Sequence, residues 1–549
     1  MSSQVIRAAA TRPDRSTDAV PEVTTPPPAP PSGSVRFPMR WPNPLQFAAI
    51  VACLITSGLA SGLTSGLAIE RTVAADQPRP PNVVLIFIDD MGYADIGPFG
   101  AKAYATPNLD RMAAQGRRFT DFVVSSAVCS SSRAALMTGC YHQRIGIDGA
   151  LGPASEIGIN PDEVTLAELC RSRGFATACF GKWHLGHHPK FLPTNHGFDR
   201  FFGLPYSNDM WPLHPENIAK LKRDPAAKSS WPPLPMLQSS APGKVSVINH
   251  DVQPSDQKLM TRQFTERAVG FIREHADRPF FVYLPHPMVH VPLYVSPEFE
   301  GKSGAGPFGD AVMEVDWSVG QILDTIDSLG LGEETLVIFT TDNGPWLSYG
   351  QHAGSAGPLR EGKGTMFEGG YRVPTLMRWS GTIPAGTTCR ELASTIDVVP
   401  TVAKLIGADL LPHPIDGLDI SELMRSDSAR SPHDHLLCFY APRSLHAVRT
   451  PRWKLHLPHP YRTLAGKPGG RDGQPVPYGA AEIGLSLFDL QADLGETTDL
   501  SAKHPEVVKE LLTIADRARS ELGDQLTRTP GTAVRPAGKM NPGDPRLTW

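Results

Sequence analysis

The chain has 549 residues, a formal net charge of −4 at pH 7, and a composition of 40% hydrophobic and 20% charged residues. This composition is ordinary for a globular protein, and the length allows a large core and a second domain. The slight acidity gives no sign of nucleic-acid binding, which favours a basic stripe, so we expect no nucleic-acid partner. Gly and Pro are frequent, with 50 and 54 residues, so we expect many loops. Catalytic groups tend to lie on such loops.

The first 75 residues have the composition of a leader. Residues 1–44 are rich in Pro, Ser, Thr and Ala and have too few apolar residues to form a core. An apolar stretch from Leu45 to Ile69 follows, and small residues end it at Ala75. This pattern predicts an export signal cleaved near Ala75. The alternative is an uncleaved membrane anchor, the one case in which we expect contact with a membrane.

The sequence therefore predicts an exported protein that acts in the periplasm or outside the cell. The chain contains no Asn-x-Ser/Thr sequence, the acceptor for N-glycosylation in secreted eukaryotic proteins. Its absence favours a bacterial source. The seven cysteines are an odd and sparse set, which does not make a disulfide framework.

Four short runs of β-branched and aromatic residues predict buried parallel strands. They span Val83–Ile88, Ala176–Phe180, Phe280–Leu284 and Leu336–Thr340. Apolar residues recur with helical spacing between them, in Pro107–Phe119, Gln257–Ala276 and Asp310–Leu329. The alternation predicts an α/β fold with a large, mostly parallel sheet flanked by helices on both faces. Ligands bind such sheets beyond the carboxyl ends of the strands.

The pattern changes after about residue 425, so we expect a catalytic domain over 76–425 and a smaller C-terminal α+β domain over 426–549. Short antiparallel strands are predicted at His435–Tyr440, His446–Arg449, Trp453–Leu457 and Leu485–Leu490, followed by a helix at Pro505–Glu521. The Pro- and Trp-rich segment Trp211–Ser246 has little periodicity and predicts a surface excursion near the pocket. The Pro/Gly-rich tail after Leu526 is predicted to be loose.

Two pairs of polar residues follow predicted strands. Asp89 and Asp90 end the first strand, and Asp342 and Asn343 end the last one. Each pair alone is more typical of a turn or a helix cap, but both pairs lie at strand ends of one predicted sheet. Three carboxylates and an amide form an oxygen-only set that suits a hard cation, Ca²⁺ more than Mg²⁺.

Cys129 begins the sequence Cys-Ser-Ser-Ser-Arg, which has the Cys-x-Ser-x-Arg form read by enzymes that oxidise cysteine to formylglycine. A lone cysteine is most often a buried apolar residue. Here three serines follow it, and a predicted helix begins there, so backbone N–H groups point at an anion held at this end. Arg133, one turn on, adds a fixed positive charge.

Basic residues flank these segments. Lys182 and His184 alternate in an extended loop, so both side chains can face one site. Lys363 lies between two glycines that allow close approach of the backbone. His286 and His290 lie beside prolines, and for His286 a merely structural role is an equal alternative.

The region from Asn82 to Pro374 resembles the sulfatase family, within the alkaline-phosphatase superfamily, and is most similar to its arylsulfatase A type. The matching segments are Asp89–Tyr93, Cys129–Arg133, Gly181–Gly186, Pro205–Asp209, His290–Pro292, Asp342–Gly344 and Gly362–Gly370, with Ile396–Thr401 and Leu487–Leu490 downstream. The resemblance implies an alkaline-phosphatase-like fold. One departure is Ser131, where the family often has Pro, so which maturation enzyme acts stays open.

The resemblance also implies roles for individual residues. Cys129 is expected to be converted, by a formylglycine-generating enzyme or an anaerobic sulfatase-maturing enzyme, to formylglycine that hydrates to a gem-diol. Asp89, Asp90, Asp342 and Asn343 are expected to bind Ca²⁺, which also holds the residue at position 129. The remaining implied residues stabilise the diol (Arg133), contact the sulfate (Lys182, Lys363, Ser207), lie near the leaving oxygen (His290) and act as the base (His184).

The chemistry of sulfate esters agrees with this set. Negative charge builds on the leaving oxygen and the sulfuryl group, and a metal, two lysines and a histidine donor can stabilise it. The predicted function is hydrolysis of sulfate monoesters, on an aryl sulfate or a sulfated carbohydrate. The alternatives are a phosphodiesterase or phosphonate monoester hydrolase of the same superfamily, and a binding protein with an inactive site.

Overall fold

The computed structural model describes residues 79–409, 413–440 and 443–548, and the predicted leader, 1–75, lies outside them. A ten-stranded sheet forms the centre, in the order β12-β2-β11-β10-β1-β9-β5-β6-β7-β8. Its strands are β1 (Asn82–Ile88), β2 (Arg117–Phe119), β5 (Ala176–Lys182), β6 (Arg200–Leu204), β7 (Met236–Ala241), β8 (Lys244–Asn249), β9 (Phe280–Pro285), β10 (Thr335–Thr341), β11 (Thr375–Arg378) and β12 (Thr387–Cys389). All four strands predicted in this region are present.

The sheet is mixed and has a parallel centre, in agreement with the predicted fold class. The five central strands, β10, β1, β9, β5 and β6, run parallel. Antiparallel pairs extend the sheet on both sides, with β11 beside β10 and β7 beside β6. The four predicted strands correspond to β1, β5, β9 and β10, whereas β6 and the outer strands were not predicted.

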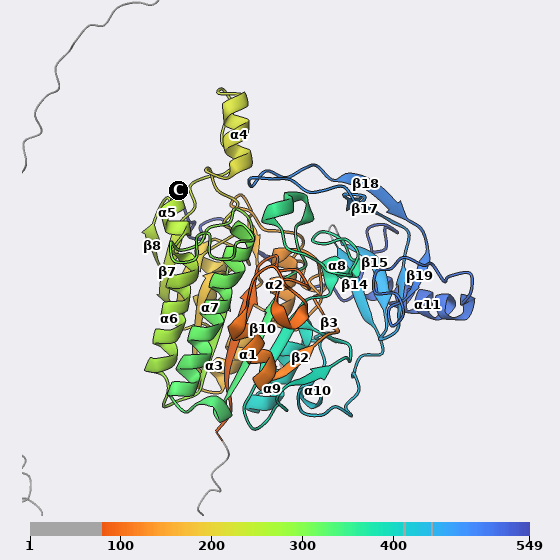
Figure 1. The fold of residues 1–549 in the computed structure, drawn as a ribbon, viewed down its shortest axis with the longest axis horizontal. Helices are drawn as coiled ribbons and strands as arrows, with labels where there is room; N and C mark the ends of the chain where they lie inside the picture. Colours follow the sequence, from red (N-terminus) through yellow and green to blue (C-terminus); the bar gives the residue numbers. More distant parts are fainter. Residues whose placement is uncertain (1–78, 410–412, 441–442, 549) are drawn as a thin grey trace, which may run out of the picture. The chain divides into compact units, whose positions relative to one another are not determined.

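Alternation along β1 divides the core into two layers, because successive side chains of a strand point to opposite faces. Val84, Ile86 and Ile88 pack with α1 (Pro107–Gln115), α6 (Met260–Glu274) and α7 (Pro307–Ser328). Val83 and Leu85 pack with α2 (Cys129–Thr138), α3 (Leu166–Ser172) and α9 (Val398–Ile406). Helices α6 and α7 lie side by side in Figure 1. The prediction of helices on both faces is confirmed.

Two predictions about local structure are wrong in part. The helix predicted from Pro107 to Phe119 ends at Gln115, because Gly116 leaves the helical conformation and β2 begins at Arg117. The segment Trp211–Ser246 was predicted as an aperiodic excursion, but it contains α4 (Pro215–Arg223), β7 and part of β8. Helix α4 does project outward from the body (Figure 1).

A second, four-stranded antiparallel sheet lies beside the large one, in the order β14-β15-β16-β19 (Figure 1). Its strands are β14 (Leu436–Tyr440), β15 (Ser444–Arg449), β16 (Trp453–His456) and β19 (Ser486–Asp489), and α10 (Ser421–Arg425) precedes it. Helix α11 (Pro505–Leu522) packs against β15. A separate hairpin is formed by β17 (His459–Thr463) and β18 (Gly479–Ile483). The predicted small domain of mixed α and β structure is therefore present.

The prediction of a loose tail after Leu526 is wrong. Strand β20 (Gly538–Lys539) pairs with β4 (Ile157–Gly158), and Arg535 forms an ion pair with Glu163 at 2.7 Å. These contacts join segments that are far apart in the sequence. The composition of the tail alone therefore could not predict them.

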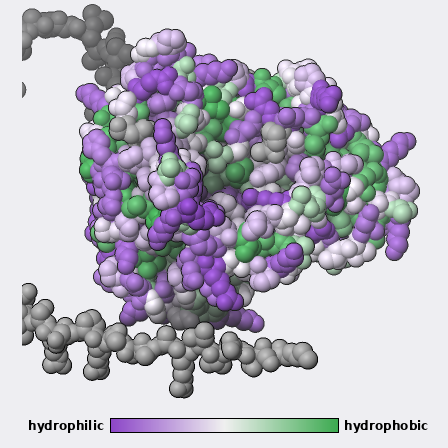
Figure 2. Space-filling model, turned by 90° about the horizontal axis from the view of Figure 1, so that it is seen from above, coloured by the Kyte–Doolittle hydropathy of each residue, from purple (hydrophilic) through white to green (hydrophobic). Residues whose placement is uncertain are grey.

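The surface mixes polar and apolar side chains. Figure 2 shows hydrophilic and hydrophobic residues interspersed over the face seen from above. Large exposed apolar residues, such as Ile248, Leu418 and Leu526, are far apart in the sequence. Within the described ranges, no helix is long and apolar enough to cross a bilayer.

Candidate active site

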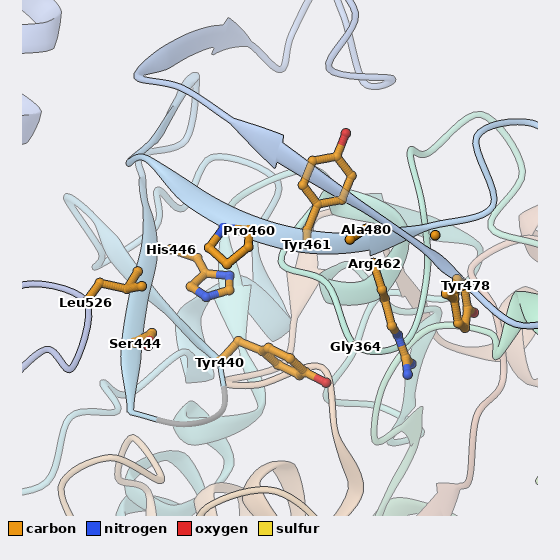
Figure 3. A pocket seen from close by; sticks show the side chains of 11 residues that line it. Gly364, Tyr440, Ser444, His446, Pro460, Tyr461, Arg462, Tyr478, Ala480 and Leu526 are labelled. Atoms are coloured by element: carbon orange, nitrogen blue, oxygen red, sulfur yellow. The ribbon is translucent and has the colours of Figure 1, made fainter.

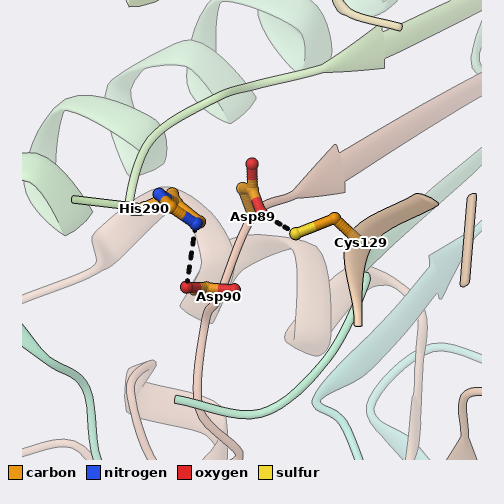
Figure 4. Close-up of side chains that lie close together, drawn as sticks. All are labelled: Asp89, Asp90, Cys129 and His290. Carbon is orange, nitrogen blue, oxygen red and sulfur yellow. Dashed lines mark hydrogen bonds and ion pairs between the residues drawn. The ribbon is translucent and has the colours of Figure 1, made fainter. Parts of the chain in front are cut away.

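The predicted site residues meet at the carboxyl ends of the central strands. Asp89 and Asp90 follow β1, Asp342 and Asn343 follow β10, and Lys182 ends β5. The loop after β9 carries His290, and α2 brings Cys129 to the same place (Figure 4). Parallel strands end at one edge of a sheet, so residues distant in the sequence converge there. The structure brings all eleven predicted site residues into one buried cluster.

Asp90, Asp342 and Asn343 form the polar centre of this cluster. The Asn343 amide donates a hydrogen bond of 2.7 Å to Asp90, and the Asp90 backbone N–H donates one of 3.1 Å to Asp342. Asp90 has φ of 60°, a conformation that non-glycine residues rarely adopt and that is often held at functional sites. The Asn343 amide oxygen is buried and has no hydrogen-bond partner. A buried oxygen that accepts no hydrogen bond needs another partner, and a metal ion can be that partner.

The electrostatics of the carboxylates also fit a cation. Burial and the neighbouring charge of Asp89 raise the pKa of Asp342 to about 7. Burial acts in the same direction on Asp89, but Lys182, His290 and Arg133 outweigh it and hold its pKa well below the ordinary value. Packing carboxylates together in a buried site is unfavourable unless positive charge compensates them.

These oxygens fit a divalent ion such as Ca²⁺ or Mg²⁺. Among the described residues, one group of possible ligands, Asp89, Asp90, Cys129 and His290, has its ligand atoms within 4.8 Å of one another (Figure 4). That group overlaps only partly with the predicted one. We favour the oxygen set with Asp342 and Asn343, because a hard cation prefers carboxylate and amide oxygens to thiol and imidazole.

Cys129 is the first residue of α2 and is 2% exposed. Its Sγ lies 3.5 Å from Asp89 Oδ1 and 3.5 Å from Lys363 Nζ. Burial raises the pKa of the Cys129 thiol, and the two lysines nearby do not overcome that effect. The thiolate is the nucleophilic form of cysteine. An unmodified Cys129 is therefore protonated at neutral pH and is a poor nucleophile.

Three cations surround Cys129. Lys363 Nζ lies 2.7 Å from Asp90 Oδ1, and Lys182 Nζ bonds Asp89 and lies 3.0 Å from Ser207 Oγ. Arg133 Nη2 pairs with Asp342 at 2.9 Å, and its Nη1 donates a hydrogen bond to the Lys182 carbonyl. Each cation has a carboxylate partner, which is the usual condition for burying a charge. A cation bound to these carboxylates would leave the ammonium groups of Lys182 and Lys363 available to an anion.

The histidines of the cluster differ in their surroundings. His184 Nε2 lies 3.0 Å from the Leu151 carbonyl oxygen, and its Nδ1 is buried without a partner. Burial and then Lys182 lower the pKa of His184 well below the ordinary value, so the ring is neutral. His290 Nε2 lies 3.4 Å from Asp90 Oδ2. His286 instead bonds Ser318 at 2.9 Å inside the core, which agrees with a structural role.

Two further residues, Trp346 and Asp209, also lie beside the cluster. The Trp346 ring lies 5.4 Å from the His290 ring, and Lys363 Nζ lies 4.4 Å from the Trp346 centroid. Partial burial of Asp209 acts to raise its pKa, but the charges of His290 and Lys182 outweigh this effect and lower it. Asp209 lies two residues after Ser207, and Trp346 lies three after Asn343. Their closeness in sequence to predicted site residues is the signal that indicates a place in the site.

Comparison with known proteins agrees with this geometry. The sulfatase family model matches residues 81–408, and the model for the C-terminal region of aryl-sulfatase matches residues 431–540. The chain belongs to the sulfatase family. Members of this family hydrolyse sulfate esters. The chain is 40% identical over 452 residues to arylsulfatase A of Bos taurus, covering 79% of this chain and 86% of that one.

Solved sulfatase structures share the fold. The PsFucS1 sulfatase from Pseudoalteromonas sp. matches with a TM-score of 0.74 and 28% identity, covering 83% of this chain and 93% of that one. The structure of Ps i-CgsB in complex with k-i-k-neocarrahexaose matches with a TM-score of 0.65 and 26% identity, covering 80% and 92%. The predicted fold class and family are confirmed.

Proposed function

We propose that this sulfatase hydrolyses sulfate monoesters with a formylglycine formed from Cys129 and a Ca²⁺ ion held by Asp89, Asp90, Asp342 and Asn343. The supporting observation is the position of Cys129, at a helix N-terminus and 3.5 Å from both Asp89 and Lys363. A helix N-terminus favours an anion, and so do the lysines. An unmodified thiol with a raised pKa could not perform this chemistry at neutral pH.

The proposed nucleophile needs a maturation enzyme, either a formylglycine-generating enzyme or an anaerobic sulfatase-maturing enzyme. Because Cys129 is 2% exposed, that enzyme must reach it before the site has folded. Formylglycine supplies, when hydrated, two hydroxyls on one carbon, one to take the sulfuryl group and one to help release it. The ion supplies positive charge that stabilises the developing negative charge.

The side chains of the chain bind and orient the sulfate. Lys182 and Lys363 present their ammonium groups to the anion, and the Ser207 hydroxyl, 3.0 Å from Lys182 Nζ, lies within reach of the same oxygens. Arg133, paired with Asp342, holds the carboxylates in place and donates to the Lys182 carbonyl. Fixed donors of this kind need no reorganisation when charge develops, which makes them effective in catalysis.

His184 and His290 move protons in this proposal. The Leu151 carbonyl only accepts hydrogen bonds, so His184 Nε2 carries the proton and Nδ1 keeps its lone pair. A neutral ring with a free, buried Nδ1 is suited to act as a general base. His290, beside Asp90 and Trp346, is placed to protonate the leaving oxygen. The two histidines thus have separate roles.

The substrate class follows from these features only in outline: an aryl sulfate or a sulfated carbohydrate. We also propose that the protein is a bacterial enzyme exported to the periplasm or the cell exterior, on the composition of Leu45–Ile69. Extracellular sulfated glycans are then accessible substrates.

The proposed function is tested by direct comparison of esters that share a leaving group. Purified protein coexpressed with a maturation enzyme is assayed with 4-nitrophenyl sulfate, bis(4-nitrophenyl) phosphate and a 4-nitrophenyl phosphonate ester. We expect the sulfate ester to have the highest kcat/KM. A higher value for either phosphorus ester would instead support the phosphodiesterase or phosphonate hydrolase alternative.

A further inference from the structure

A cavity of about 470 Å³ lies beside the proposed sulfate site, under the hairpin of β17 and β18. Its lining includes Gly364, Tyr440, His446, Tyr461, Arg462 and Tyr478, from four segments of the chain (Figure 3). The volume is within the range of small-molecule sites, about 300–1,000 Å³. Gly364 directly follows Lys363, so the cavity and the sulfate site share one stretch of backbone.

Arg462 forms the boundary between the two sites. Its Nε donates a hydrogen bond of 3.1 Å to the Lys363 carbonyl, and its Nη2 donates to the same oxygen. Gly364 has φ of 84°, and a Cβ there would lie 2.3 Å from the Arg462 guanidinium, so only glycine leaves room for this contact. The guanidinium also lies 4.6 Å from the Tyr478 ring centroid.

Arg462 forms no ion pair with an acidic residue in the described part of the chain. Within residues 79–409, 413–440 and 443–548, the ion pairs of the structure include none with Arg462. The Lys363 carbonyl accepts hydrogen bonds from the Arg462 guanidinium but does not compensate its positive charge. A partly exposed, uncompensated guanidinium in a pocket is suited to bind a carboxylate or a sulfate group in a bidentate manner.

His446 lines the pocket with an imidazole ring. The side chain is 5% exposed, its ring stacks 3.9 Å from the His459 ring, and its Nδ1 is buried with no hydrogen-bond partner. Burial lowers the pKa of His446 well below the ordinary value, so the ring is neutral and adds no charge to the lining.

The lining favours a sugar over a lipid. Tyr440, Tyr461 and Tyr478 line the cavity with aromatic rings, whereas Leu526 is the one large aliphatic side chain among the lining residues. The hydroxyls of Tyr461 and Tyr478 already accept hydrogen bonds from Arg360 and the Ser348 backbone. A pyranose ring has the same combination of apolar faces and polar edges, and aromatic residues with a polar tip suit such ligands. A sterol or acyl chain would need a largely aliphatic lining.

We propose that this pocket binds the sugar residue next to the sulfated one in an acidic glycan, and that Arg462 pairs with a carboxylate or sulfate group on that neighbouring residue. The proposal rests on the proposed function, since it places the sulfated sugar at Lys363. It adds a specificity-determining residue, Arg462, and a chemical class of substrate, an oligosaccharide with negative charge on two adjacent residues.

Binding without turnover tests the proposal separately from catalysis. Isothermal titration calorimetry on Cys129→Ala protein compares three probes: N-acetylgalactosamine 6-sulfate, a chondroitin 6-sulfate tetrasaccharide with a neighbouring carboxylate, and a carrageenan hexasaccharide with a neighbouring sulfate. We expect at least one oligosaccharide to bind at least tenfold more tightly than the monosaccharide. Which of the two does so identifies the anion that Arg462 prefers.

The variant Arg462→Gln, made in the same Cys129→Ala background, is expected to remove that tenfold advantage while monosaccharide affinity changes by less. Arg278→Gln, an exposed arginine without a described ion pair, is the charge-matched control and should retain the advantage. Equal binding of all three probes overturns the proposal. So does an equal loss for monosaccharide and oligosaccharide in Arg462→Gln, which would assign Arg462 to support of Lys363 alone. Hydrolysis of 4-nitrophenyl sulfate by the unmutated protein reports on the proposed function independently.

Discussion

Arg133 and Asp342 form a fully buried ion pair, in which Nε and Nη2 lie 3.2 and 2.9 Å from one carboxylate oxygen. The pair connects α2, which carries Cys129, to the end of β10, which carries the proposed metal ligands. The position of residue 129 relative to the carboxylates therefore depends on a charge pair that water does not reach.

Removal of the cation from this pair should destabilise the fold. Arg133→Met leaves Asp342 buried beside Asp89 without its partner, and breaking a buried pair typically costs about 3–5 kcal/mol. We expect a loss of that size in the free energy of unfolding, measured by urea denaturation. Arg111→Met, which breaks an exposed pair with Asp324, should cost under about 1 kcal/mol. Equal costs for the two variants would contradict the structural role of the buried pair.

Cys129→Ala should abolish turnover of 4-nitrophenyl sulfate and leave folding nearly intact. The reason is that Cys129 is the proposed source of the nucleophile, whereas the lost volume is a single sulfur atom. Circular dichroism and thermal unfolding check the fold. Cys389→Ala removes a buried sulfur distant in sequence from the site and should retain activity. Wild-type rates in Cys129→Ala would show that another residue attacks the ester.

Asp342→Ala should weaken metal binding and activity together. A ligand that binds only the folded state stabilises it by about 2.7 kcal/mol at a concentration of 100 times its Kd. Added CaCl₂ should therefore raise the unfolding temperature of the unmutated protein, and this increase should shrink in the variant. We expect activity to fall by about a hundredfold or more, because stabilisation of charge at the reacting group is lost. Asp324→Ala, at an exposed carboxylate, is the control.

Chelation provides the complementary observation for the metal. Dialysis against EGTA should lower activity, and Ca²⁺ should restore it. Full activity after chelation, confirmed by metal analysis, would count against the assignment of these four residues as ligands.

Because His196 is buried, we expect the free energy of unfolding to fall in acid. Its ring is fully buried against Trp183, and burial lowers its pKa to about 4. The unfolded chain takes up the proton near pH 6.5, so stability is lost as pH falls from about 6.5 to about 4. His196 alone should contribute a loss of about 2 kcal/mol between pH 7 and pH 5.

The variant His196→Phe isolates this contribution, because phenylalanine keeps an aromatic ring at the position and cannot titrate. Urea unfolding of both proteins at pH 7 and pH 5 removes any pH-independent cost of the substitution. The variant should lose about 2 kcal/mol less than the unmutated protein over this interval. An identical loss in the two proteins would show that His196 does not titrate with a lowered pKa.

Most of the candidate site could be predicted from the sequence because it lies at the ends of buried strands. Strands such as β1 and β10 are continuous apolar runs, and the polar residues that interrupt them, Asp89 and Asp342, mark where each strand ends. Parallel pairing then brings these ends together without further information. Motif resemblance added Ser207, which has no local signal of its own.

The parts that sequence reasoning missed depend on contacts between distant segments. Arg462 bonds the Lys363 carbonyl from a hairpin about a hundred residues away in the chain. Arg535 holds the tail through Glu163, although the tail composition is that of a loose segment. Sequence periodicity and motif spacing do not predict such contacts, because the contacting residues become neighbours only in the folded structure.

The most direct measurement is the mass of the tryptic peptide Phe119–Arg133, taken from natively produced, active protein. We expect the mass of a peptide with formylglycine at position 129, together with labelling by an aldehyde-specific hydrazine. An unmodified thiol at position 129 in protein that hydrolyses sulfate esters would contradict the proposed nucleophile.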